Sequence, residues 1–222
     1  MKILKPKHYL NKRLKPKMVG SVKTYPVYIR FTIGTSNHRI KSVILENLED
    51  EKQLLEHKKE IDLEKNVINY LYTRFHNYSF SHFNSDAFYL CSPIQVIISL
   101  YIYTYADEFE DVALTVYEKE LFAHLLSKTN FPKPFLSKMI ENIDFNTRVP
   151  SDFIKDKKLK LIVDSFNSSI IFNENESDIF CIYNWKHTDI KDKFRNQFGS
   201  SSFNFIEKVI ELYSSSLNDF LD

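Results

Sequence analysis

The sequence predicts an α+β protein in which a small, basic, antiparallel sheet packs on a long helix and is followed by a mostly helical region. Residues 25–33 alternate apolar and polar side chains, as a half-buried strand does, and residues 48–75 contain neither Pro nor Gly. Charge is divided unevenly: residues 1–45 hold 11 Lys and Arg and no Asp or Glu, although the whole chain sums to +1. The remaining residues therefore carry a net charge of −10.

These observations divide the chain into three parts: a basic sheet at 1–46, a connecting or supporting helix at 47–76, and an acidic, mostly helical region at 77–222. The length and a hydrophobic content of 43% indicate a folded protein with a sizeable core.

The strand over residues 25–33 should have one buried and one exposed face, because successive side chains of a strand point to opposite sides. Residues 34–37 have turn chemistry, residues 38–45 resume an extended pattern, and an earlier strand is expected around residues 8–14. The apolar face of the strand then holds four residues and the polar face three, namely Val27, Ile29, Phe31 and Ile33 against Tyr28, Arg30 and Thr32.

A single helix is expected from Leu48 to Phe75, where apolar residues recur every seven positions at Leu54, Ile61, Ile68 and Phe75. Its first half is densely charged, which is typical of a solvated helix with a narrow contact seam. The seam could pack on the protein's own sheet, or it could serve self-association or a partner helix.

A further helix should begin after Ser92, where Ser caps and Pro93 occupies the first helical position. It would end near residue 106 and span about 20 Å, too short for roughly 30 Å of membrane hydrocarbon. Residues 77–91 should form a packed connection, and residues 169–185 a short hairpin or irregular segment. Other helices are expected near 115–128, 134–142, 151–165 and 188–197, and from about 205, with Asn204 as its cap and Glu207 as the cap's partner.

No reaction can be derived from the sequence. The seven His residues lack metal-ligand spacing, Asp107 to Asp111 is expected to be a solvated helix face, and no nucleophile elbow or phosphate-binding loop is present. Cys91 and Cys181 are expected to be buried thiols in a reducing cytoplasm. We therefore predict a non-enzymatic, cytoplasmic protein without cofactor, metal or membrane span.

The basic N-terminal part predicts binding to nucleic acid, because Lys and Arg on an exposed sheet can neutralise phosphates and reach base edges. Two alternatives remain open: the basic part binds another acidic partner, or it is merely a solvated face. The candidate DNA-binding residues are Lys12, Arg13, Lys15, Lys17, Lys23, Tyr28, Arg30, Thr32, Arg39 and Lys41.

Residues 9–45 resemble the arm-type DNA-binding domain of tyrosine recombinases, the phage-type integrases found in Bacteroidetes mobile elements. The resemblance lies in a basic entry strand, the strand "TYPVYIRFTI", the turn "GTSNHR" and the return "IKSVIL". It implies a small sheet that rests on a helix and reads duplex DNA, in an accessory or regulatory protein of a mobile element or phage.

The chain departs from that family in two respects. The turn "GTSNHR" is longer than usual, and the His-x-x-Arg box of the catalytic domain is absent from the sequence. Tyr213 stands where a nucleophile could be sought, but it also completes the apolar stripe of the last helix. Strand cleavage is therefore not expected. A non-enzymatic assembly component, whose basic part binds an acidic neighbour, is the alternative function.

Overall fold

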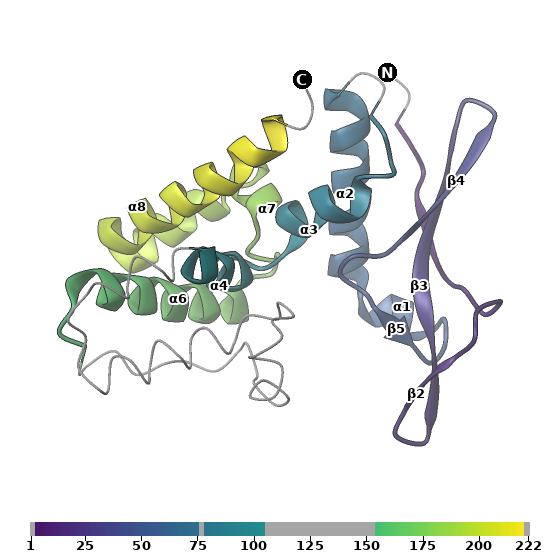
Figure 1. The fold of residues 1–222 in the computed structure, drawn as a ribbon, viewed down its shortest axis with the longest axis horizontal. Helices are drawn as coiled ribbons and strands as arrows, with labels where there is room; N and C mark the ends of the chain where they lie inside the picture. The colour runs from purple at the N-terminus through teal and green to yellow at the C-terminus, as the bar shows by residue number, and fades with distance from the viewer. Residues whose placement is uncertain (1–2, 76–77, 105–153, 220–222) are drawn as a thin grey trace. The chain divides into compact units, whose positions relative to one another are not determined.

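The computed structural model describes residues 3–75, 78–104 and 154–219, which divide into two compact units (Figure 1). Unit 1 comprises Met1–Ser92 with Ser216–Asp222, and unit 2 comprises Pro93–Ser215. Unit 1 contains an antiparallel sheet and unit 2 is helical in its described part, which confirms the α+β class. The boundary between the two units lies after Ser92, whereas the sequence predicts a boundary between residues 76 and 77.

The central strand of the five-stranded sheet is β3 (Val22–Ile33), because every other strand pairs with it. Both β1 and β4 pair with the stretch Tyr28–Arg30, so they lie on opposite sides of β3, whereas β2 pairs with its first residues. The four partner strands are β1 (Lys7–Leu10), β2 (Lys17–Val19), β4 (Ser36–Lys41) and β5 (Asn47–Leu48).

Two details of the predicted sheet are wrong. The early strand ends at Leu10 instead of continuing to residue 14, and the chain turns there, with the N–H of Leu14 bonded to the carbonyl of Asn11. The turn after β3 consists of Gly34 and Thr35 alone, so the return strand begins at Ser36 and ends at Lys41. Gly34 has a φ of +59°, which a two-residue hairpin turn requires and glycine adopts at little cost.

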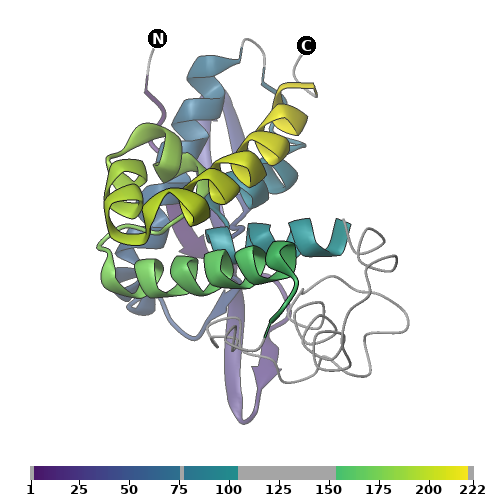
Figure 2. The same cartoon turned by 90° about the vertical axis from the view of Figure 1, so that its left-hand side faces the viewer.

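The single helix expected over residues 48–75 is also wrong. Leu48 belongs to β5, and the helical part consists of α1 (Gln53–Glu56) and α2 (Lys58–Arg74). The two are separated at His57, where φ is −95° and ψ is +36°, outside the α-helical region. Figures 1 and 2 together show α2 lying along one face of the sheet.

The core of unit 1 lies between the sheet and α2. Val27, Ile29 and Phe31 are buried, as the alternation predicts, while Arg30 and Thr32 are exposed. The helix buries Leu63, Val67, Ile68 and Leu71.

The first half of the expected helical seam packs within unit 1. Leu54 and Ile61 lie against a small cluster formed by Leu10, Val27 and Leu45. The seam residues therefore serve the protein's own sheet.

Helix α3 (Phe83–Cys91) occupies most of the predicted connection between residues 77 and 91. The Phe80 ring just before it lies 4.7 Å from the Phe31 ring of β3. Tyr78 donates a hydrogen bond to Asp86, and burial followed by this bond raises the pKa of the Tyr78 hydroxyl. These contacts hold the beginning of α3, and Cys91 at its other end is buried.

The described part of unit 2 consists of four helices. The first of them begins at Ile94 and confirms the helix predicted after Ser92. None of the helices in the described residues is both long and apolar enough to cross a membrane. Their bounds are α4 (Ile94–Thr104), α6 (Lys157–Asn175), α7 (Ile182–His187) and α8 (Ile190–Asp219).

Aromatic rings form the centre of unit 2. The Phe172 ring lies 4.8 Å from Phe180 and 5.3 Å from Phe194, and the Phe180 and Phe194 rings stack at 5.1 Å. Trp185 lies 5.9 Å from Phe194. Cys181, which follows Phe180 in the chain, is fully buried, and burial raises the pKa of its thiol to about 12.

Two predictions about unit 2 are wrong. Residues 169–175 continue α6 instead of entering a hairpin, because their apolar residues remain on its buried face. The helix expected from about residue 205 begins earlier, within α8, so Asn204 lies inside a helix and does not cap one. The helix expected near 188–197 forms the first part of α8, which bends at Gly199. The helices expected at 115–128 and 134–142, and the start of that at 151–165, lie outside the described residues.

Candidate nucleic-acid interface

The face of the sheet that points away from α2 carries ordered rows of cationic and aromatic side chains. Residues directly opposite each other in neighbouring strands lie on the same face. Lys7 of β1 is opposite Arg30 of β3, and Arg30 is opposite Arg39 of β4. The three cations therefore form one row across the sheet, which we call the cationic row.

A second row lies beside the cationic row. Tyr9 is opposite Tyr28, and Tyr28 is opposite Lys41, while Thr32 and Asn37 form a further pair on the other side. All cations of this face are exposed, and the two tyrosines are half-buried. We call the surface formed by these residues the outward face.

Side-chain contacts hold the outward face in order. The Arg30 guanidinium lies 5.7 Å from the centre of the Tyr9 ring, and the Tyr9 and Tyr28 rings are 6.3 Å apart. The Thr32 hydroxyl donates a hydrogen bond of 2.9 Å to the Asn37 amide oxygen. Arg30 is therefore held at the centre of the face, since a cation over a tyrosine ring is stabilised by the ring's quadrupole.

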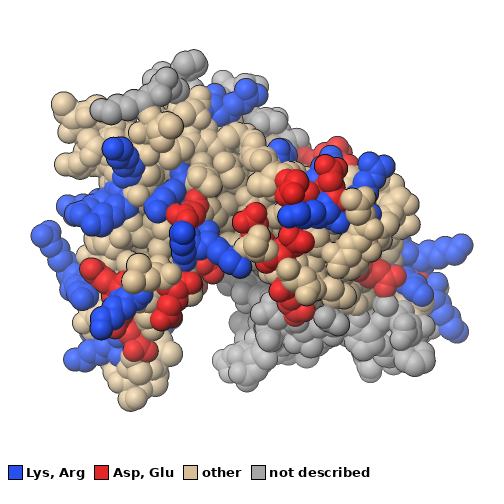
Figure 3. Space-filling view, turned by 180° about the vertical axis from the view of Figure 1, so that it is seen from behind, with Lys and Arg blue, Asp and Glu red and all other residues tan. Residues whose placement is uncertain are grey.

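The cations of the outward face have no acidic partner in the part of the chain that the structure describes. In Figure 3, Lys and Arg side chains stand out along the left margin of the picture, where unit 1 lies. Like charges directly opposite each other in a sheet destabilise it. The cationic row thus costs folding stability that no described ion pair offsets.

The carboxylate of Glu64 on α2 positions the edge strands from behind. It is fully buried and accepts hydrogen bonds from the Ser42 hydroxyl (2.7 Å) and from the backbone N–H of Val43 (2.6 Å) and Ile44 (3.3 Å). Its other contact is with Nε2 of buried His8 in β1, at 2.8 Å. One carboxylate therefore ties β1 and the chain after β4 to the same helix.

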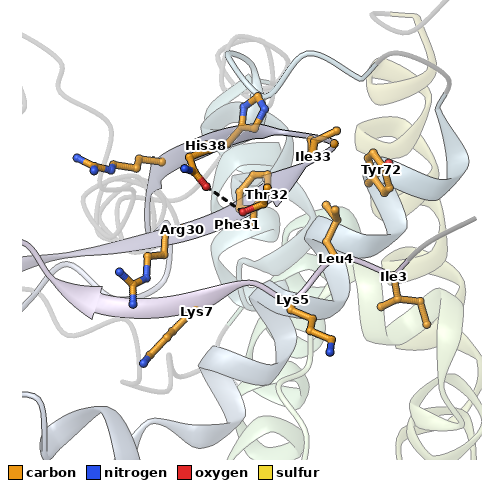
Figure 4. A pocket seen from close by; sticks show the side chains of 13 residues that line it. Ile3, Leu4, Lys5, Lys7, Arg30, Phe31, Thr32, Ile33, His38 and Tyr72 are labelled. Atoms are coloured by element: carbon orange, nitrogen blue, oxygen red, sulfur yellow. Dashed lines mark hydrogen bonds between the residues drawn. The ribbon is translucent and has the colours of Figure 1, made fainter.

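A second polar contact fixes the segment that precedes β1. The amide of Asn69 on α2 accepts a hydrogen bond from the N–H of Leu4 (2.8 Å) and donates one to its carbonyl (3.3 Å). This segment and the β3–β4 hairpin line a groove of about 700 Å³ at one end of the outward face. In Figure 4 the side chains of Lys5, Lys7 and Arg30 point to the same side of the sheet.

The structure brings together five of the ten candidate residues. Tyr28, Arg30, Thr32, Arg39 and Lys41 share the outward face, as their register shows.

The other candidates lie apart from the rows. Three are in the connection between β1 and β2, namely Lys12, Arg13 and Lys15. The last two belong to the hairpin of β2 and β3: Lys17 is opposite Thr24, which places it on the same side as Tyr28, and Lys23 is opposite Met18.

Sequence reasoning missed Lys7 and Tyr9. Lys7 precedes the strand expected around residues 8–14, and Tyr9 lies within that strand but was not assigned to either of its faces. The signal that could have found them is the alternation of Lys7 and Tyr9 with the buried residues His8 and Leu10, which repeats the two-residue period of β3.

Comparison of the chain with protein-family models, with curated proteins and with solved structures found no match. Among the described residues there is no group of three His, Cys, Asp or Glu side chains that could hold a metal ion.

Proposed function

We propose that unit 1 binds duplex DNA through the outward face of its sheet, as part of a non-catalytic accessory or regulatory protein. The observation that carries this proposal is the cationic row, in which Lys7, Arg30 and Arg39 stand side by side without an acidic partner in the described chain. A repulsive arrangement of this kind is relieved when an anionic polymer such as the DNA backbone covers it.

The dimensions of the sheet agree with the major groove. Three neighbouring strands are about 10 Å across, at roughly 4.8 Å per step, and the major groove of B-DNA is about 12 Å wide. Arg30, on the middle strand, would reach the base edges at the floor of the groove, where Arg recognises guanine. Lys7, Arg39 and Lys41, on the outer strands, would contact phosphates on the two walls.

The contact between Arg30 and Tyr9 gives a reason why an Arg side chain suits position 30. A long side chain loses rotamer freedom when it binds, and that loss lowers the affinity. Because the Arg30 guanidinium already lies over the Tyr9 ring, part of this loss occurs on folding. Its direction is therefore set before DNA arrives.

The mobile-element or phage context rests on the resemblance of residues 9–45 to integrase arm domains. Within unit 1 the order of elements agrees with it, since a small sheet rests on a helix. Unit 2 would then supply a protein contact or regulation.

The test is a salt titration of the affinity of the full chain for a fluorescent duplex of about 25 base pairs, measured by anisotropy. Three cations on phosphates predict a log–log slope of about −3, at roughly −0.9 per contact. Replacing Arg30 by Ala should weaken binding by about 10-fold or more, as the loss of a base-edge contact does.

The matched control is Arg74→Ala, which removes the same side chain from the exposed surface of α2. This variant should bind as the wild type does. If the wild type shows no affinity for duplex DNA at low salt, or if Arg30→Ala and Arg74→Ala weaken binding equally, the proposal is wrong.

A further inference from the structure

The hairpin of β2 and β3 has an exposed apolar tip. The side chains of Met18, Val19 and Val22 are 53%, 57% and 37% exposed. Val19 is opposite Val22, and Met18 is opposite Lys23, so apolar groups occupy both faces of the tip. We call residues 18–22 the hairpin tip. Clustered apolar side chains at the end of a projecting element indicate a contact surface.

The hairpin is built to project. All three residues of β2 are exposed, and they pair only with the first residues of β3. The connection between these strands is Gly20–Ser21, with Gly20 at a φ of +61°, so the strands remain paired to the last residue. In Figure 1 the hairpin extends past α1 and β5. The tip therefore stands free of the core of unit 1.

The charge around the tip selects an anionic partner. Lys17 and Lys23 flank it, Lys15 precedes β2, and all three are exposed. The sequence contains no acidic residue before Glu46. A partner that fits must offer negative charge around a site that accepts apolar side chains, and the grooves of DNA do so, with phosphates on their rims and stacked bases between them.

We propose that the hairpin tip inserts apolar side chains into the minor groove at a base step next to the major groove occupied by the outward face, and kinks the duplex there. This inference rests on the proposed function. Val22 precedes Arg30 by eight residues on β3, a distance of about 26 Å at roughly 3.3 Å per residue. Major and minor grooves are about 17 Å apart, half of a roughly 34 Å helical turn, so the tip can reach across one phosphate backbone.

The charged and the apolar side chains of the hairpin then have separate roles. Lys17 and Lys23 neutralise the phosphates of the backbone that the hairpin crosses. Met18, Val19 and Val22 replace stacking between two base pairs, which is least costly at pyrimidine–purine steps. The duplex bends because the apolar side chains separate neighbouring base pairs on one side only.

The test uses the full chain and a duplex that carries 2-aminopurine at a central TA step, with dyes at both ends to report bending by energy transfer. The tip variant combines Met18→Gln, Val19→Thr and Val22→Thr, which keep side-chain size while removing apolar surface. Because these positions are exposed, its melting temperature should equal that of the wild type.

At saturating protein, the wild type should raise 2-aminopurine fluorescence and energy transfer, and the tip variant should lose both changes while keeping the salt slope of its affinity. Arg30→Ala is the matched control: it should need more protein to saturate, yet reach the wild-type signal.

Two classes of outcome separate the two proposals. If the wild type does not bind the duplex at all, the proposed function is wrong. If it binds but leaves stacking and bending unchanged, or if the tip variant matches the wild type, only the role of the tip is wrong. Recruitment of the wild type, but not the tip variant, to anionic lipid vesicles, without any change in the duplex signals, would assign the tip to a membrane surface and overturn this inference.

Discussion

The two units of this protein bury different kinds of side chain. Unit 1 buries carboxyl and imidazole groups, namely those of Glu64, Asp86 and His8, whereas the buried polar groups in the described part of unit 2 are Ser, Asn and Gln side chains. The centre of unit 2 is an aromatic cluster around Phe172 and Phe194. A sheet whose outward face is exposed has only one face left for a core. The strands of unit 1 are therefore positioned by directional hydrogen bonds, while the helices of unit 2 are positioned by the packing of their side chains.

The largest effect should come from removing the carboxylate that joins the strands to α2. Glu64→Ala leaves the buried His8 and Ser42 side chains and the half-buried N–H groups of Val43 and Ile44 without this acceptor. We expect a loss of about 3–5 kcal/mol of unfolding free energy in unit 1. In urea titrations the far-UV circular dichroism transition should divide in two, while the fluorescence of Trp185, the single Trp of the chain, should keep its midpoint.

Glu64→Gln provides the control for side-chain volume, since the amide oxygen can still accept from the backbone N–H groups. It should lose less stability than Glu64→Ala. Equal losses in both variants would mean that packing, and not hydrogen bonding, positions the strands, and the contrast between the units would disappear.

A smaller effect is expected at the bend of α8 in unit 2. Gly199 has a φ of +75° and a ψ of −176°, a conformation that residues with a Cβ adopt only with strain. A Cβ at this position would meet no atom within 4 Å, so the cost of Gly199→Ala is confined to the backbone. We expect a destabilisation of about 1–3 kcal/mol, measured by Trp185 fluorescence in urea.

The neighbouring substitution Ser200→Ala, at an exposed position, should change the stability by less than about 0.5 kcal/mol. DNA affinity should be unchanged in both variants. Wild-type stability of Gly199→Ala would show that the bend is not a fixed part of unit 2.

The smallest effect is a pH dependence in unit 2. Burial raises the pKa of the Cys181 thiol from about 9 to about 12, so the folded protein keeps this proton at a pH where the unfolded chain loses it. This contribution to stability is present below pH 9 and is lost as the pH rises toward 12. By pH 10 about 1 kcal/mol of it has been lost. The stability of Cys181→Ala, followed by Trp185 fluorescence, should therefore decline less between pH 8 and pH 10 than that of the wild type. Parallel declines would contradict a buried, protonated thiol.

The sequence was sufficient to predict the central strand and five of the eight residues of the outward face. The alternation of Val27, Ile29 and Phe31 with Arg30 and Thr32 is a local property, and the structure confirms it. The register that aligns Lys7 and Arg39 with Arg30 depends on the lengths of two connections, which local patterns do not reveal.

The helix was harder to predict because its burial depends on distant partners. Leu54, Ile61 and Ile68 form a seven-residue repeat, but the buried face of α2 also includes Leu63, Val67 and Leu71, at helical spacing. A charged residue such as Glu64 is expected on the solvent side of a helix. Its burial follows from the unpaired backbone N–H groups after β4, which only the folded chain places beside it.

The alternation of β3 has a consequence for how this chain can change by insertion and deletion. The core and the outward face are the two sides of one strand. Removing a single residue between Val27 and Arg30 would therefore turn the side chains on one side of the deletion to the opposite face of the sheet. Charged side chains would then face α2 and apolar ones the solvent. Within this strand, changes in length should be tolerated only in steps of two, or where a bulge absorbs the extra residue, whereas the exposed connection at residues 11–16 is free of this constraint. The outward face and the core of unit 1 are consequently inherited as one pattern.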